Sequence, residues 1–102
     1  MPVSEGGASS FQVHISGVMA QRLREVQDQA NVAGQGKAAL SAFRTIVGRL
    51  KQDPMDFGEM LYYLPALRLQ IRHAAIKPIF VDFAVSKDHA VVFIKGVELL
   101  GR

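Results

Sequence analysis

The sequence predicts a small α+β domain in which a hairpin of two helices packs on one face of a mostly antiparallel sheet. A chain of 102 residues, 49% of them hydrophobic, is long enough for one hydrophobic core and too short for two. Its apolar residues alternate at the start, follow helical spacing to about residue 52, and then alternate again. The expected order of elements is β-α-α-β-β-β-β, since two short amphipathic helices need a sheet to cover.

The chain is expected to begin with a disordered segment and one strand. Residues 1–10 read MPVSEGGASS and offer no packing face, so they are expected to be a disordered lead-in to a single domain over residues 11–102. Residues 11–16, FQVHIS, alternate between apolar and polar side chains, which is typical of a half-buried strand. Ser16 is then well placed to cap the helix that follows, because its hydroxyl can accept a free amide of the first turn.

Two helices should follow this strand. The first runs from Gly17 to about Asn31, and the loop NVAGQGK leads from it to a second helix, from Lys37 to Gln52. The second helix ends at Asp53, because a residue before proline avoids the helical region. Their expected apolar stripes are Met19, Leu23, Val26 and Ala30 in the first helix, and Leu40, Phe43, Val47 and Leu50, flanked by Ala39 and Ile46, in the second.

Four strands are expected in the remainder of the chain, paired as an antiparallel meander. They are EMLYYLP, LRLQIR, PIFVDFAV and AVVFIKGV, beginning at residues 59, 67, 78 and 90. A short turn after Arg72 should separate the middle two, and the polar linker from Ser86 to His89 has the length of a hairpin loop. The first strand of the chain should pair inside this sheet or at its edge.

Composition narrows the classes of function. The absence of cysteine rules out disulfides and thiolate chemistry, and the three histidines show no metal-ligand spacing, so neither a metal nor a cofactor is expected. The polar start is unlike a secretory leader, and no apolar run approaches the roughly 20 residues that span a bilayer. We therefore expect a cytoplasmic protein. A net charge of +3 permits a polyanionic partner without requiring one.

Two stretches, together with the element order, resemble the RelE/ParE superfamily of bacterial toxins. "LKQDPMDFGEMLYYLP" is similar to the end of a helix, a proline-containing loop and a glycine before the second strand in that superfamily. "LRLQIRHAAIKPIFVDFAV" resembles its strand of alternating apolar and arginine residues, followed by a turn and an apolar strand. "AVVFIKGV" matches the last strand in character, so the resemblance extends from about Phe11 to Val97.

The resemblance implies that the chain is the toxin of a bacterial toxin–antitoxin pair, and it favours a ribosome-dependent mRNA endoribonuclease. Members of the superfamily that act as nucleases cleave mRNA, usually on the ribosome, and so inhibit translation. By position, Arg72 matches an arginine that stabilises charge on the scissile phosphate. Lys77 lies near the usual second arginine, and His73 and Glu98 are the candidate acid or base groups. Arg68 and Lys95 are the expected contacts to RNA phosphates. A cognate antitoxin is the expected protein partner.

The chain also departs from the family's pattern, and this keeps other functions open. Lysine at position 77 cannot reproduce the guanidinium fork of arginine, and no tyrosine or histidine follows the last strand. The alternatives are a ParE-like inhibitor of DNA gyrase and a catalytically inactive protein-binding module of the same fold. The sequence leaves open whether the chain forms a homodimer.

Other readings compete for the same residues. Arg68 and Arg72 could be the solvated face of a strand on alternation alone. Asp82 interrupts an apolar strand, and a buried carboxylate needs a partner, which Arg72 or Lys77 could supply. The adjacent tyrosines 62 and 63 should point to opposite faces, one into the core and the other outward.

Overall fold

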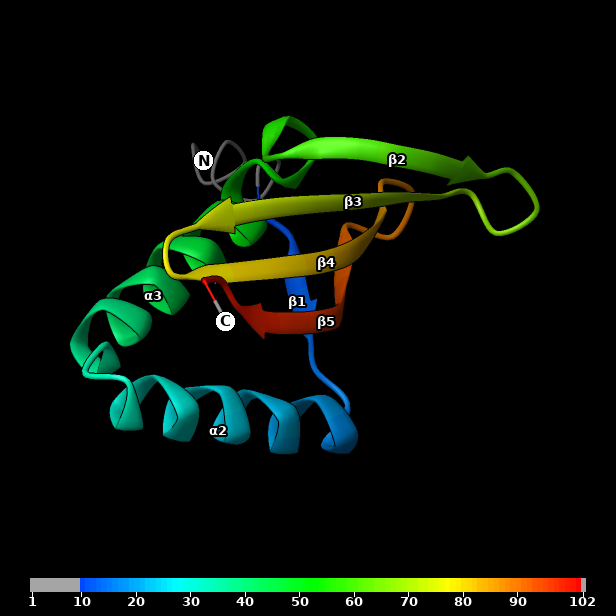
Figure 1. Cartoon of the computed structure of the whole chain (residues 1–102). Helices are drawn as coiled ribbons and strands as arrows, with labels where there is room; N and C mark the ends of the chain where they lie inside the picture. The colour runs from blue at the N-terminus through cyan, green and yellow to red at the C-terminus, as the bar shows by residue number, and fades with distance from the viewer. Residues whose placement is uncertain (1–9, 102) are drawn as a thin grey trace, which may run out of the picture.

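The computed structural model describes residues 10–101, which form the α+β fold and the order of elements that the sequence predicts (Figure 1). The expected disordered lead-in lies, apart from Ser10, outside the described residues and stays a prediction. The elements are β1 (Gln12–His14), α2 (Gly17–Val32), α3 (Gly36–Gln52), a short 3-10 helix η1 (Pro54–Asp56), β2 (Glu59–Leu64), β3 (Leu69–Ile76), β4 (Ile79–Ser86) and β5 (Val91–Leu99).

The five strands form one sheet in the order β1-β5-β4-β3-β2. Strands β2 to β5 pair antiparallel as the predicted meander, and β1 runs parallel to β5 at the edge. The pairing shifts by one residue at Leu61 in β2 and at Lys95 in β5, which makes each of them the extra residue of a bulge. As a result, Met60 and Tyr62 lie on opposite faces of the sheet although they are two residues apart.

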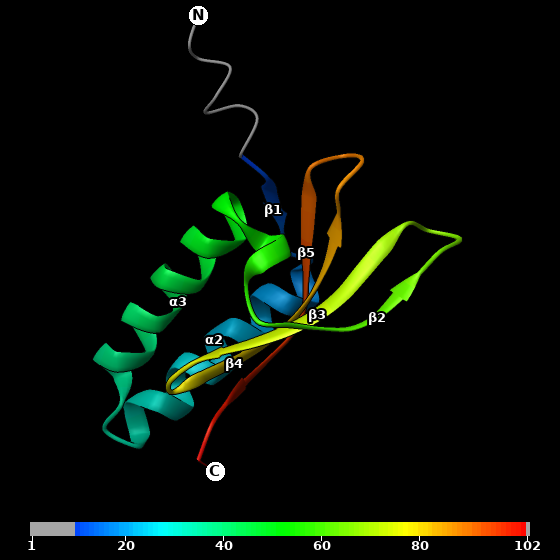
Figure 2. The same ribbon diagram turned by 90° about the horizontal axis from the view of Figure 1, so that it is seen from above.

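Both helices pack on the same face of the sheet, as Figure 2 shows from above. Helix α2 begins as predicted, with the Ser16 hydroxyl accepting a hydrogen bond from the Met19 amide at 3.1 Å. The Nε of Arg22 donates to the carbonyl oxygen of Val97 at 3.1 Å, which ties α2 to β5. The core between the layers contains Val26, Ala30, Leu50, Phe57, Val81, Phe83, Val85, Val92, Ile94 and Val97, among others. Within residues 10–101, no helix is long and apolar enough to cross a membrane.

The apolar stripe of α3 differs from the prediction. The buried residues are Ala39, Ala42, Ile46 and Leu50, whereas Leu40 is 46% exposed. Leu50 and the predicted flanking residues Ala39 and Ile46 are buried as expected, so the stripe is shifted toward the flank rather than reversed. The two alanines fit this shift, because small side chains allow α3 to approach the sheet closely.

Strand β3 also differs from the prediction, since it starts at Leu69 rather than residue 67 and continues to Ile76. Arg68 lies in the β2–β3 turn with a φ of +55°, so it cannot continue a strand. The expected turn after Arg72 is wrong, because the four residues from His73 to Ile76 each pair with a residue of β4. Because β3 pairs with β4 over its whole length, the pairing shows which face of the sheet each side chain of β3 occupies.

Candidate functional site

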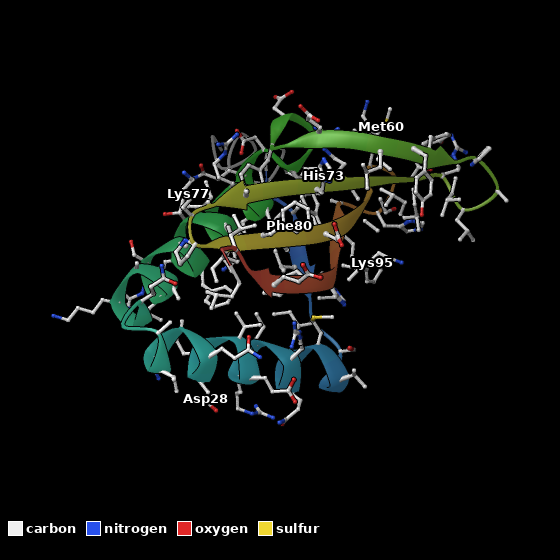
Figure 3. All side chains as sticks on the ribbon, in the orientation of Figure 1. Asp28, Met60, His73, Lys77, Phe80 and Lys95 are labelled. Atoms are coloured by element: carbon white, nitrogen blue, oxygen red, sulfur yellow. The ribbon has the colours of Figure 1, made fainter. Side chains whose placement is uncertain are left out.

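Within residues 10–101, helices cover one face of the sheet and no helix covers the other (Figure 3). Adjacent residues of β3 point to opposite faces. Arg72 pairs across the strands with Phe83, a fully buried core residue. His73 pairs with Asp82, and both side chains lie on the uncovered face. Since directly opposed residues share a face, these pairs define the two faces for the whole sheet.

Arg72 is buried on the covered face, where it binds backbone. Its side chain is 8% exposed, its Nε donates to the Phe57 carbonyl at 3.2 Å and its Nη2 to the Gly58 carbonyl at 3.1 Å. Its Nη1 donates to Gln70 Oε1 at 3.0 Å. The expectation of Arg72 on an exposed face beside Arg68 is wrong, and so is the expected ion pair with Asp82, which faces the other way. In this position Arg72 holds the loop that leads into β2.

The other two predicted phosphate-binding cations near β3 lie in turns. Arg68 is in the β2–β3 turn, where its Nε contacts Asp88 Oδ2 at 2.9 Å and its side chain stays 70% exposed. Lys77 is exposed in the turn between β3 and β4, at the opposite end of the strand. The structure therefore does not bring Arg68, Arg72 and Lys77 together in one site.

The uncovered face contains a row of mostly apolar side chains, ending in a histidine, that crosses all five strands. Following the pairing from β2 to β1, this apolar row consists of Tyr62, Ile71, Ala84, Phe93 and His14. The rings of His14 and Phe93 are 5.6 Å apart, and Phe93 is partly exposed. Ile71 and Ala84 are buried without belonging to the core under the helices. Both tyrosines are about half exposed, so the expectation that one lies in the core is wrong.

A polar row lies beside the apolar row and consists of Glu59, His73, Asp82 and Gly96. His73 Nε2 is 3.7 Å from Glu59 Oε1, and the histidine ring meets the ring of Phe80 edge-on at 5.4 Å. Gly96 leaves room for Asp82, because a Cβ at this position would be 3.2 Å from the Asp82 carboxylate. Of the predicted site residues, His73, Glu98 and Lys95 thus lie on strands of the uncovered face, in reach of solvent.

The charge on the uncovered face is predominantly negative. Its strands carry three carboxylates, Glu59, Asp82 and Glu98, and one lysine, Lys95, at the bulge of β5. Helix α3 instead contains four cations and no carboxylate. A face with this sign repels the phosphates of RNA and attracts basic groups, because the field of a surface follows its summed charge.

On the covered side of the β2–β3 hairpin, a hollow is lined by two cations. It lies beyond the helices, has a volume of about 350 Å³, and is lined by Met55, Tyr63, Arg68, Gln70, Val85, Lys87 and Asp88. The charged groups of this hollow are two cations, Arg68 and Lys87, and one carboxylate, Asp88, and the phenol of Tyr63 lies beside them. Lys87 and Tyr63 were not among the predicted site residues. The polar linker after β4 was the signal that could have identified Lys87, because it returns the chain to the β2–β3 turn.

The loop before β2 is organised by two arginines. The guanidinium of Arg49 stacks over the ring of Phe57 at 4.7 Å, and its Nε donates to Asp53 Oδ1 at 2.8 Å. The hydrogen bond to Asp53 raises the pKa of Arg49 above its ordinary value. Sequence reasoning did not identify Arg49, because its partner Phe57 is separated from it by a helix end and a 3-10 turn.

Comparisons with family models, curated proteins and solved structures found no match for this chain. In residues 10–101, no group of three or more histidine, aspartate or glutamate side chains could hold a metal ion. The chemistry of the two surfaces is therefore judged from their own geometry: a sheet face with aromatic and acidic side chains on one side, and a small hollow lined by two cations on the other.

Proposed function

We propose that this protein acts by binding another protein through the uncovered face of its sheet, as the toxin of a bacterial toxin–antitoxin pair whose target is a protein such as DNA gyrase. The toxin assignment is supported by the resemblance of residues 11–97 to the RelE/ParE superfamily and by an order of elements that agrees with it. A cognate antitoxin would neutralise the protein by covering this face.

The negative charge of the uncovered face is the observation that favours a protein target over RNA. Three carboxylates and an apolar row that includes Tyr62 and Phe93 suit a partner with basic and apolar side chains. Arg72, the residue best matched to a catalytic arginine, donates hydrogen bonds to the carbonyls of Phe57 and Gly58 and to the side chain of Gln70. Because Arg72 is buried on the covered side of the sheet, a nuclease that relied on it would have to bring its guanidinium out to the substrate.

Induced expression in bacteria tests this proposal. We expect the wild-type chain to arrest growth while cellular mRNA stays intact, and we expect Phe93→Ala to relieve the arrest by removing a partly exposed ring of the apolar row. Val32→Ala is the matched control, since Val32 is 89% exposed at the end of α2, a helix that packs on the opposite face of the sheet. Absence of growth arrest by the wild-type chain would contradict the toxin assignment.

A ribosome-dependent endoribonuclease is the second candidate, and the cationic hollow under the β2–β3 hairpin favours it. Arg68 and Lys87 could hold a phosphate there, with Tyr63 as the neighbouring group that donates or accepts a proton. This candidate expects mRNA cut at defined positions in the same expression experiment. Lys87→Ala should then abolish cleavage, whereas Lys37→Ala on α3 should leave it unchanged.

A further inference from the structure

Strand β2 is an edge of the sheet with few protective features. It lies last in the strand order, and β3 is its one strand neighbour within residues 10–101. A monomeric protein usually protects such an edge with lysine or proline inside the strand, because free N–H and C=O groups invite another strand. Between Glu59 and Leu64, β2 contains neither residue type, and the bulge at Leu61 is its one such protective feature.

The side chains beside this edge are apolar on both faces of the sheet. Met60, Leu61, Tyr62 and Tyr63 are between 48% and 52% exposed. The bulge at Leu61 places Met60 on the covered side and Tyr62 on the uncovered side. Figures 1 and 2 both show the β2–β3 hairpin extending beyond the two helices, so neither face of its far end is shielded by them. A partner strand with apolar side chains on both of its own faces would match this edge.

The charges near β2 have an order that selects one pairing direction. Acidic Asp56 and Glu59 lie at the start of the strand, and basic Arg68 lies in the turn after its end. A second β2 placed antiparallel brings the start of each strand next to the turn of the other. Glu59 of each copy then lies near the turn that contains Arg68 of the other, where Arg68 also contacts Asp88 of its own copy, whereas a parallel arrangement would put Glu59 beside Glu59, which is unfavourable.

We propose that a second copy of this chain pairs with β2, antiparallel about a two-fold axis near the Leu61–Tyr62 peptide, and so joins two five-stranded sheets into one. The interface is isologous, since the same strand supplies both sides. It leaves the uncovered face of each copy accessible, so it does not depend on the proposed function. With about six residue pairs and no helix contact, the interface is small, and we expect a dissociation constant on the order of 10 µM.

Sedimentation of the purified chain over a concentration series around that value tests the dimer. Leu61→Lys places a charge at the centre of the interface and should leave the chain monomeric throughout the series. Val32→Lys is the control, because it adds the same charge at an exposed site on α2 and should dimerise like the wild type. Circular dichroism and thermal melting check that both variants are folded.

A charge exchange separates this pairing from any other association. Arg68→Glu and Glu59→Lys each create like-charge contacts at both ends of the symmetric pair, and each should weaken dimerisation about tenfold. An equimolar mixture of the two variants restores opposite charges at both ends and should recover the wild-type affinity at low salt. If the two variants weakened dimerisation only by losing contacts to Asp88 or His73 within one copy, mixing them would not restore the affinity.

Three results would overturn the proposal. One is a wild-type chain that stays monomeric across the series with rapidly exchanging β2 amides, which would leave the edge for a strand of a different protein. Another is a dimer that is unaffected by Leu61→Lys. The third is a pair of charge variants that the mixture does not rescue.

Discussion

The covered and uncovered faces of the sheet handle their polar groups in different ways, and the adjacent residues Arg72 and His73 show the difference. On the covered face, Arg72 is buried and all three of its hydrogen bonds go to neighbouring groups of the same fold. On the uncovered face, the polar contact of His73 is to a largely exposed carboxylate, Glu59, at 3.7 Å, and its ring meets Phe80 edge-on. The polar groups of Arg72 therefore bond within the fold, while those of His73 and Glu59 lie in reach of solvent and of a binding partner.

The largest test of this contrast uses two phenylalanines of the same strand. Phe83 is fully buried against Phe57, with ring centres 5.9 Å apart, and Phe83→Ala should cost about 3–5 kcal/mol of unfolding free energy. Phe80 lies partly exposed on the uncovered face, and Phe80→Ala should cost about 1 kcal/mol. Urea denaturation measures both values. Equal losses would show that the uncovered face is a second core.

Substitution of Gly58, in the loop that leads into β2, should have the next largest effect. Gly58 has a φ of +69°, and a Cβ there would overlap the carbonyl of His73 and lie 2.7 Å from the Cβ of Ala74. Gly58→Ala should therefore destabilise the protein by more than about 2 kcal/mol. Gly34→Ala is the control, since Gly34 has a similar φ but open space around it, and its cost should come from backbone strain alone.

Replacing the buried arginine isolates its hydrogen bonds from its packing. Arg72→Met keeps much of the volume but leaves the carbonyls of Phe57 and Gly58 without their donor, at a cost of about 2–3 kcal/mol. Arg68→Met breaks an exposed ion pair with Asp88 and should change the unfolding free energy by less than about 1 kcal/mol. Thermal melts compare the two, and a larger loss for Arg68→Met would reverse the assignment of structural and surface roles.

Local patterns in the sequence were enough for the order of elements, the Ser16 cap and the meander, because these depend on periodicity and on neighbours in the chain. The face of Arg72 was not predictable in the same way. Both faces of β3 contain apolar residues, with Ile71 on one and Ile76 on the other, so alternation alone does not say which face the helices cover. The carbonyls that Arg72 binds belong to residues 14 and 15 positions earlier, a requirement that no local pattern shows.

The smallest expected effect is the one that tests whether the polar row is available for binding. Glu59 is 85% exposed on its side chain, so its contact with His73 is screened by water. Glu59→Gln, His73→Ala and the double variant should form a cycle with a coupling energy below about 0.5 kcal/mol. A coupling well above this value in urea denaturation would mean that the row is held in place for stability, as Arg72 is. A weak coupling combined with a loss of growth arrest would assign the row to partner binding, since a residue that stabilises nothing can affect activity only through what it contacts.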